Sequence, residues 1–294
     1  WWFSHLDLSE YDLVISSSGA EAKGVKTGPN TLHVNYCHSP THYYWIRYDD
    51  YLTHPGFGRL DPLARFGLKA LIGPLRRWDL KAAQRPDVMI ANSTHTQAMI
   101  KKYYKRDSTV IHPPVDIDRF KSKETALRNG FVIAGRQTPY KRIDLAIEAC
   151  SQLMVPLVVI GNGPDHKKLK KLAGRSVTFL TNVSDDEMAA HFRSAEAFIF
   201  PGLDDFGITP VEAMAAGTPV IAYRGGGSLD YIVPGKTGLF FDKQTVKSLV
   251  STLQDFNPDR FDANTITEYA AQFSADKFQK NPQKFVKPQR SEER

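Results

Sequence analysis

The chain of 294 residues has about the length of two domains, at roughly 100–200 residues each. Apolar residues make up 41 % of it and charged residues 24 %, a balance that excludes a wholly disordered protein. Lys and Arg outnumber Asp and Glu by 38 to 32, and the resulting net charge of +6 permits an anionic ligand or surface without requiring either. The basic residues are dispersed and no RNA-binding aromatic motif accompanies them, so we expect no nucleic-acid partner.

The chain begins Trp1-Trp2-Phe3-Ser4-His5, with neither an initiator Met nor a signal segment, which predicts an N-terminally truncated chain that starts inside a domain. No apolar run approaches the ~18 residues that a membrane span needs. The two cysteines, Cys37 and Cys150, are too few for a disulfide framework, and no CxxC pair indicates zinc. These features favour a cytoplasmic location.

The first half of the chain predicts the back part of an α/β domain. We expect strands near residues 13–17, 32–36, 88–91 and 109–111, and helices over about 62–84 and 93–104. A charged linker over 112–129 would complete a first region of residues 1–127. Between residues 62 and 85 six Lys or Arg stand against one Asp, with apolar residues interleaved. This segment fits peripheral contact with an anionic membrane, and it equally fits an ordinary surface helix.

The second half alternates short apolar runs with amphipathic segments. Runs that are apolar on both faces predict strands of a parallel sheet covered on both sides. Six of them, at 131–134, 157–160, 177–180, 197–200, 219–222 and 239–241, make one complete doubly wound domain over 128–255. Residues 256–294 follow as C-terminal helices and a charged tail.

Two basic residues lie where the first of these strands gives way to a helix. The strand ends at Ala134, and we expect the helix to begin near Tyr140, which puts Arg136 and Lys141 at the carboxyl edge of the sheet. A helix N-terminus and two long cations favour a diphosphate there, although a solvated basic turn has the same sequence. The turn at residues 161–164 lacks the third glycine of a dinucleotide fingerprint, so a tight strand-to-helix turn is its simplest interpretation.

Two carboxylates flank the start of a later helix. Asp204 lies in the loop after the strand at 197–200, and Glu212 lies inside the helix that Gly217 ends. Carboxylates accept hydrogen bonds from vicinal hydroxyls, and the N–H groups of Phe206, Gly207 and Ile208 can hold phosphate or sugar oxygens. The alternative is that Asp204 and its neighbour only cap the helix and that Glu212 faces solvent.

Residues 135–142 and 204–217 together resemble the donor-site pair of retaining glycosyltransferases of family 4, which have the GT-B fold. Residues 11–16, 36–40, 91–93 and 111–116 resemble the same family in its own order, and more narrowly its bacterial O-antigen mannosyltransferase-like branch. The resemblance implies an α/β protein with two Rossmann-like, doubly wound domains that face a cleft. The first domain would be incomplete, because the family's Gly-rich loop should precede Trp1.

The resemblance implies a role for each charged residue of the donor site. Arg136 and Lys141 would hold the donor diphosphate and stabilise its charge as the glycosidic bond breaks. Glu212 matches the second Glu of the family's Glu-x7-Glu motif, which binds the ribose. Asp204 stands where the first Glu contacts the donor sugar, and it is one methylene shorter.

The resemblance also assigns residues outside these two segments. His38 matches the histidine that reaches the donor sugar from the first domain, although a buried structural histidine fits the same strand end. Asn182 and Val183 fall where the family reads the base with backbone groups. At Ile46-Arg47 this chain departs from the branch, which has an acidic residue there.

The function implied is that of a retaining glycosyltransferase that moves a hexose, mannose from GDP-mannose, to a lipid-linked or polysaccharide acceptor of the cell envelope. It would work at the inner face of the plasma membrane. We expect no metal and no other cofactor, because there is no Asp-x-Asp at a strand end and the two cations can neutralise the diphosphate. The alternative is a donor-binding remnant without useful catalysis, and a nucleic-acid binder is a more distant one.

Overall fold

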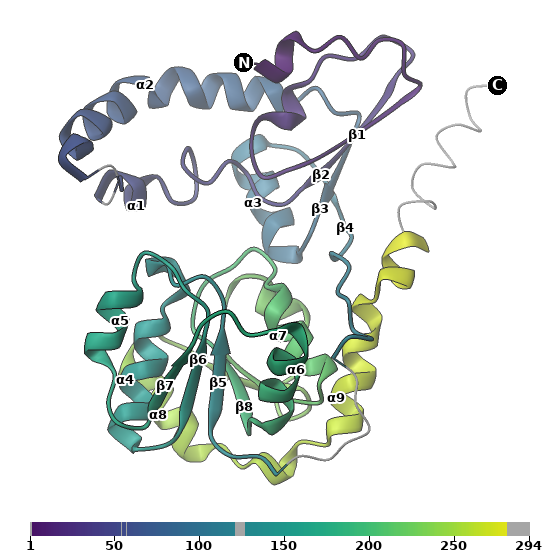
Figure 1. The fold of residues 1–294 in the computed structure, drawn as a ribbon. Coiled ribbons are helices and arrows are strands. Elements are labelled where there is room, and N and C mark those ends of the chain that lie inside the picture. The colour runs from purple at the N-terminus through teal and green to yellow at the C-terminus, as the bar shows by residue number, and fades with distance from the viewer. Residues whose placement is uncertain (1, 54, 57, 121–126, 281–294) are drawn as a thin grey trace. The chain divides into compact units, whose positions relative to one another are not determined.

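A computed structural model of the chain describes residues 2–53, 55–56, 58–120 and 127–280. The chain divides into two compact units, Trp1–His112 and Pro113–Arg294. Each unit is built on one parallel sheet (Figure 1). None of the helices in the described ranges is long and apolar enough to cross a membrane.

Unit 1 has a four-stranded parallel sheet in the order β1-β2-β3-β4. Its strands are β1 (Leu13–Ser18), β2 (Leu32–Cys37), β3 (Val88–Ala91) and β4 (Thr109–Val110). Its helices are α1 (Tyr48–Thr53), α2 (Asp61–Ala82) and α3 (Thr94–Tyr104). The predicted strands and helices of this half are confirmed, and α3 begins where the Ser93 hydroxyl caps the Thr96 N–H.

Unit 2 has a six-stranded parallel sheet in the order β10-β9-β8-β5-β6-β7. Its strands are β5 (Phe131–Ala134), β6 (Leu157–Ile160), β7 (Val177–Leu180), β8 (Ala197–Phe200), β9 (Val220–Tyr223) and β10 (Gly238–Phe241). The chain moves outward from β5 to β7, then returns to the other side of β5 and moves outward again. The strand order therefore reverses between β5 and β8, and ligands of open α/β sheets bind at such a point.

The helices of unit 2 cover both faces of this sheet (Figure 1). They are α4 (Ile143–Leu153), α5 (His166–Leu172), α6 (Asp185–Ser194), α7 (Ile208–Ala215), α8 (Val246–Asp255) and α9 (Ala263–Ala270). Figure 1 shows α4, α5 and α8 on one side and α6, α7 and α9 on the other.

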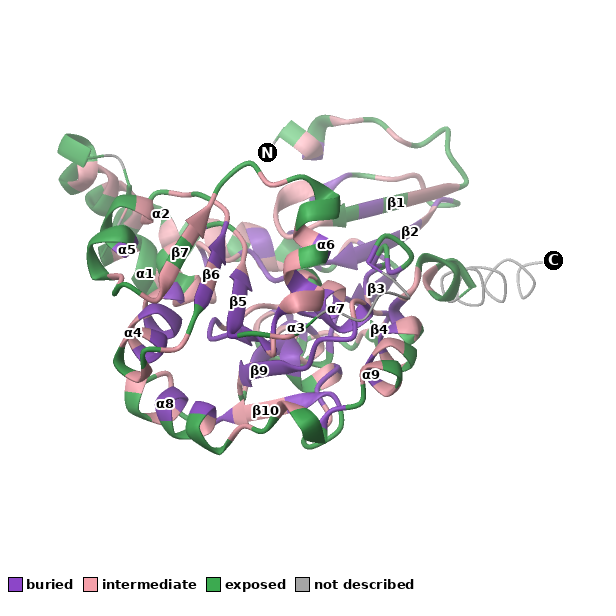
Figure 2. Ribbon diagram, turned by 60° about the horizontal axis from the view of Figure 1, so that its bottom comes forward, coloured by how far each residue is buried: buried purple, intermediate pink, exposed green. Residues whose placement is uncertain are grey.

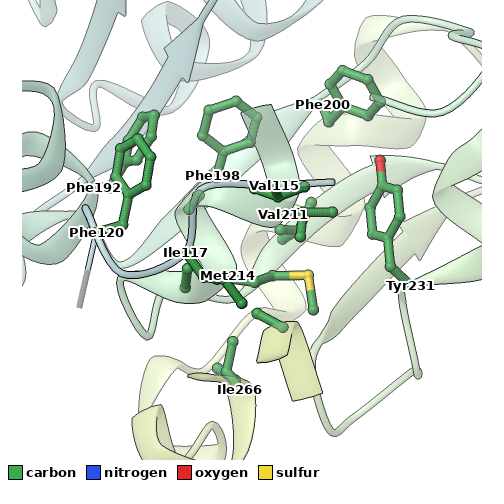
Figure 3. Close-up of a cluster of buried hydrophobic side chains, with 14 of the residues drawn as sticks. Val115, Ile117, Phe120, Phe192, Phe198, Phe200, Val211, Met214, Tyr231 and Ile266 are labelled. Carbon is green, nitrogen blue, oxygen red and sulfur yellow. The ribbon is translucent and has the colours of Figure 1, made fainter. Parts of the chain in front are cut away.

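Each face has its own hydrophobic core, and side chains alternate between the two along a strand. In β5, Val132 joins the cluster under α6 and α7, and Phe131 and Ile133 join the cluster under α4 and α8. Figure 3 draws part of the first cluster, and strands β5 and β9 are marked as buried in Figure 2. Burial on both faces explains why the inner strands β5, β6 and β8 are apolar throughout.

The boundary between the units lies earlier in the chain than the predicted division after residue 127. Val115, Ile117 and Phe120, which we expected in the linker, are buried in the core of unit 2. Beyond residue 255, Phe261 and Ile266 are buried in that same core, so this segment packs as part of unit 2. The predicted tail from residue 281 lies outside the described residues.

Candidate functional site

Two of the predicted donor-binding side chains meet where the strand order of unit 2 reverses. Lys141 follows β5 and Asp204 follows the neighbouring strand β8. The Lys141 ammonium donates to Oδ2 of Asp204 and forms an ion pair with it, and the two side chains are 25 % and 11 % exposed. The Lys141 Nζ also lies 5.8 Å from the centroid of the Phe200 ring. The fold thus joins residues that are far apart in sequence.

Gly202 allows the two loops to approach closely enough for this pair. A Cβ at this position would lie 3.0 Å from the Lys141 Cα and 3.0 Å from the carbonyl oxygen of Tyr140. Contacts that short would push the loop after β5 away from the loop after β8.

The loop after β5 differs from the prediction in its path. A 3₁₀ turn, Pro139–Lys141, comes first, Arg142 then adopts a left-handed conformation at φ 51°, and α4 begins at Ile143. The Arg142 guanidinium pairs with Asp144, with 3.1 Å between Nη2 and Oδ2. Lys141 therefore points from a turn rather than from the helix, and Arg136 is exposed in the same loop.

The glycine turn after β6 supports the loop after β5. Gln137 is fully buried: its Nε2 donates to the Gly161 carbonyl at 2.7 Å, and its Oε1 lies 2.7 Å from Nδ1 of His166. A Cβ on Gly163 would lie 2.5 Å from the Gln137 carbonyl oxygen. The tight-turn interpretation accounts for both glycines.

A run of three glycines after β9 supports the loop that carries Asp204. The Gly227 N–H donates to the Asp204 carbonyl at 2.9 Å, and a Cβ on Gly227 would lie 2.3 Å from the Phe206 Cα. A Cβ on Gly226 would lie 2.4 Å from the Asp204 carbonyl oxygen. We did not predict this role for Gly225, Gly226 and Gly227, although a glycine run two residues after a predicted strand is a visible signal.

Helix α7 begins at a residue that has no side chain to cap it. Its N-cap is Gly207 at φ 89°. The Asp204 carboxylate binds Lys141 and not this helix, so the alternative that Asp204 only caps the helix is wrong. Phe206 is buried beneath the turn, and Ile208, the first helical residue, is 44 % exposed.

Glu212 is half-buried on α7 rather than fully exposed to solvent. Burial raises its pKa above the ordinary value, and the nearby Arg119 charge opposes this rise. Asp185 and Asp116 add to the rise, and Asp185 forms an ion pair with Arg119. Glu212 thus lies at the edge of a charged cluster, where its carboxylate can accept hydrogen bonds.

The residues expected to read the base lie after the outer strand β7. Asn182 is exposed and left-handed at φ 58°, and Val183 packs partly against the core. Ser184 and Glu187 form a capping box that begins α6. This fixes the backbone next to residues 182 and 183, and their contact with a base stays a prediction.

His38 lies in unit 1, at the end of β2, and is exposed, so the alternative of a buried structural histidine is wrong. Its Nε2 lies 2.9 Å from the Ser17 hydroxyl, and its carbonyl accepts from the Asn92 amide at 2.9 Å. Its contact with a donor sugar stays a prediction.

A buried charge network holds the segment that follows His38. The Asp79 carboxylate, fully buried, pairs with Lys23 at 2.6 Å and accepts bonds from Thr41 (2.9 Å), Trp45 (2.7 Å) and Tyr104 (2.9 Å). Trp45 therefore acts in packing and hydrogen bonding inside unit 1. Among the described residues, no group of three or more His, Cys, Asp or Glu is placed to hold a metal ion.

The family model described as "Glycosyl transferases group 1" matches residues 114–273. The chain is 28 % identical over 215 residues to D-inositol 3-phosphate glycosyltransferase of Streptomyces avermitilis, covering 62 % of this chain and 46 % of that protein. It is 30 % identical over 205 residues to the GDP-mannose-dependent alpha-(1-6)-phosphatidylinositol monomannoside mannosyltransferase of Mycobacterium tuberculosis, covering 59 % and 53 %. The chain thus spans about half the length of these curated relatives.

Among solved structures, Anabaena HepE in complex with UDP-glucose superposes with a TM-score of 0.69 at 19 % identity, over 95 % of this chain and 79 % of that one. A likeness at this identity establishes the fold. The α/β prediction with two Rossmann-like units of the GT-B type is confirmed.

Proposed function

Since this chain belongs to the group 1 glycosyl transferases, we propose that it transfers a hexose from a nucleotide sugar with retention of configuration. The observation that carries the proposal is the Lys141–Asp204 pair at the reversal of strand order, with Glu212 on the helix that follows. A cation for the leaving diphosphate and two carboxylates for hydroxyl-rich groups are what a nucleotide sugar requires.

Each charged residue has a separate role in this proposal. Lys141 and Arg136 bind the diphosphate, whose charge grows as the bond to the sugar breaks. Asp204 accepts hydrogen bonds from the sugar hydroxyls, and Glu212 accepts them from the ribose. The N–H groups at residues 206–208 hold donor oxygens, residues 182 and 183 read the base, and His38 acts on the sugar from unit 1.

We propose GDP-mannose as the donor. The M. tuberculosis relative is named as GDP-mannose-dependent, whereas HepE, which is less similar, holds UDP-glucose in its crystal structure. Calorimetric titration with GDP, UDP and ADP tests the choice. We expect GDP to bind most tightly, and UDP binding tenfold tighter than GDP, about 1.4 kcal/mol, would overturn it.

We propose that donor binding needs no metal ion and no other cofactor, because the two cations neutralise the diphosphate. Donor titration with and without EDTA should then give the same dissociation constant. A loss of affinity in EDTA that Mg²⁺ restores would contradict this.

We propose a glycan or lipid-linked acceptor at the inner face of the plasma membrane, and α2 supports it. Leu63, Phe66 and Leu71 are 68 %, 70 % and 56 % exposed on this helix, and Arg65 and Lys69 are exposed among them. An apolar groove of about 450 Å³, lined in part by Leu71, lies beside them. Apolar side chains flanked by basic ones suit an anionic bilayer surface.

Vesicle flotation tests whether α2 binds an anionic bilayer surface. We expect binding to phosphatidylglycerol vesicles that falls with salt and with Phe66→Ser, and little binding to phosphatidylcholine. Equal binding to both vesicle types, or none to either, would leave α2 as an ordinary surface helix.

The alternative is that the chain binds donor without turning it over. A single-turnover assay set beside the donor titration separates the two functions. Saturable donor binding with no product formed would favour the donor-binding remnant.

A further inference from the structure

One tyrosine hydroxyl next to the proposed donor site has no hydrogen-bond partner within the described residues. Tyr231 is fully buried, and its ring packs edge-on against Phe206 at 5.5 Å between centroids. Its hydroxyl is buried with it and neither donates nor accepts a bond there. In Figure 3 the ring stands at the margin of the core cluster, with the hydroxyl toward the Phe200 end.

An unpartnered buried hydroxyl lowers stability, whereas a phenylalanine would fill the same space without that loss. Tyr104 shows the usual arrangement, because its buried hydroxyl donates to Asp79 and accepts from the Thr41 N–H. The Tyr231 hydroxyl therefore lowers the stability of the fold, and a hydrogen-bond partner supplied when a ligand binds would remove this penalty.

The hydroxyl lies directly beneath the turn that carries Asp204. A Cβ on Gly207 would lie 2.9 Å from the Tyr231 oxygen and 2.8 Å from Cζ of Phe200, so all three meet at the start of α7. The centroid of the Phe200 ring also lies 5.8 Å from the Lys141 ammonium. Burial, and next the Asp204 charge, raise the pKa of Tyr231 well above its ordinary value, so the hydroxyl keeps its proton and is a donor.

We propose that Tyr231 is a positioning residue, whose hydroxyl donates to the Asp204 carboxylate once a donor diphosphate draws the Lys141 ammonium away from it. The inference rests on the proposed function. In the structure Lys141 forms an ion pair with Asp204. When the ammonium turns to a diphosphate, the carboxylate, only 11 % exposed, loses its partner and needs another donor. Tyr231 satisfies one carboxylate oxygen, and the other remains for the sugar hydroxyls.

Tyr231→Phe tests the proposal, because it removes one oxygen and keeps the ring. We expect the melting temperature of the free protein to stay the same or rise. We expect the dissociation constant for GDP-mannose, or for UDP-glucose if that donor binds better, to rise about tenfold (~1.4 kcal/mol). Tyr104→Phe is the matched control: it removes a satisfied hydroxyl, so it should lower the melting temperature and leave donor affinity unchanged.

A double-mutant cycle with Asp204→Ala shows whether the hydroxyl acts through Asp204. In the Asp204→Ala background, Tyr231→Phe should weaken donor binding no further. A tenfold loss that persists there would mean that the hydroxyl contacts the donor itself, which overturns the positioning role. A lower melting temperature with unchanged donor affinity would make the hydroxyl structural and overturn it too.

Donor binding by the wild-type chain separates the failure of the proposed function from the failure of this inference. A wild-type chain that binds no nucleotide sugar contradicts the proposed function and this inference together. A wild-type chain that binds donor, beside a Tyr231→Phe variant that binds it equally well, contradicts this inference alone.

Discussion

At the scale of single residues, Lys141 pairs with Asp204 and is proposed to bind the diphosphate of the donor. Its ammonium now pairs with Asp204, and a donor would offer it a diphosphate whose charge increases in the transition state. Interactions that strengthen in the transition state raise turnover rather than ground-state affinity alone. Their loss is therefore seen in kcat.

We expect Lys141→Ala to lower kcat roughly 100-fold, by analogy with the loss of one oxyanion-hole donor. Steady-state kinetics with a separate donor titration measures it. Lys101→Ala is the control, because it removes a Lys–Asp pair whose side chains are 62 % and 91 % exposed, in unit 1. An active wild type whose turnover survives Lys141→Ala would rule out the diphosphate assignment.

Glu212 combines a structural cost with its proposed role in binding the ribose. Burial raises its pKa, so the folded protein takes up this proton at a higher pH than the unfolded chain does. Ionised Glu212 therefore lowers stability above that pKa, and the penalty disappears as the pH falls through it.

We expect Glu212→Gln to raise the melting temperature at pH 7 and to lose this advantage as the pH falls toward 4, where the wild-type carboxyl is protonated. The same variant should weaken donor binding by about 1.5–3 kcal/mol, the value of a hydrogen bond to a charged group. Thermal melts across pH, with and without donor, measure both effects. A stability gain that does not change with pH would show that desolvation of the charge is not its cause.

At the scale of elements, the glycine run after β9 is the support on which the Asp204 loop rests. Gly227→Ala would place a methyl group 2.3 Å from the Phe206 Cα, a backbone atom that cannot rotate away. We expect a loss of stability of about 1–3 kcal/mol, the range for overpacking, and weaker donor binding. Gly73→Ala in α2 is the control, because a Cβ there meets nothing within 4 Å and alanine favours a helix. Equal melting temperatures for the two variants would contradict the assigned contact.

The Asp79 network is the corresponding support in unit 1. Asp79→Ala leaves Lys23 buried without its counter-charge and frees three hydrogen-bond donors, so we expect a loss of about 3–5 kcal/mol in the free energy of unfolding. Lys23→Met should lower the free energy of unfolding by less, because Asp79 keeps its hydrogen bonds from Thr41, Trp45 and Tyr104. Denaturant titration compares the two, and the reverse order would mean that the ion pair, not the carboxylate network, holds the segment after His38.

At the scale of the whole molecule, acid should have opposite effects on stability through His33 in unit 1 and Glu212 in unit 2. In unit 1, burial lowers the pKa of His33 from 6.5 to about 4, and its Nε2 lies 2.8 Å from the Ser16 hydroxyl. The unfolded chain protonates this histidine near pH 6.5, whereas the folded protein does so only near pH 4. The free energy of unfolding therefore falls as the pH falls from 6.5 toward 4. Glu212 in unit 2 has the opposite sign.

We therefore expect hydrogen exchange in β2 to accelerate between pH 7 and 5, after correction for the intrinsic rate, before exchange in β8 does. His33→Gln should abolish most of this acid sensitivity in unit 1. If the variant retains the wild-type dependence on pH, another group is responsible.

The sequence by itself determined the strands of both units, the helices α2 and α3, and which residue types the site offers. The inner strands of unit 2 were predictable because a strand buried on both faces must be apolar at every position, as Ala197–Phe200 is. Arg136, Lys141, Asp204 and Glu212 could be singled out because strand ends and helix starts are local signals. The family resemblance supplied their roles, and the chain's membership of the group 1 glycosyl transferases agrees with it at the level of a glycosyltransferase.

Only the tertiary structure decided which of these residues touch. Lys141 meets Asp204 because β8 returns to pair with β5, and no local pattern encodes the order of strands in a sheet. The same reason applies to Val115, which was predicted to lie in a linker and is buried in the core of unit 2. It applies also to Gly227, because the loop that Gly227 contacts follows a different strand. The unpartnered hydroxyl of Tyr231 is visible only in three dimensions, because whether a buried polar atom is satisfied depends on every segment that folds around it.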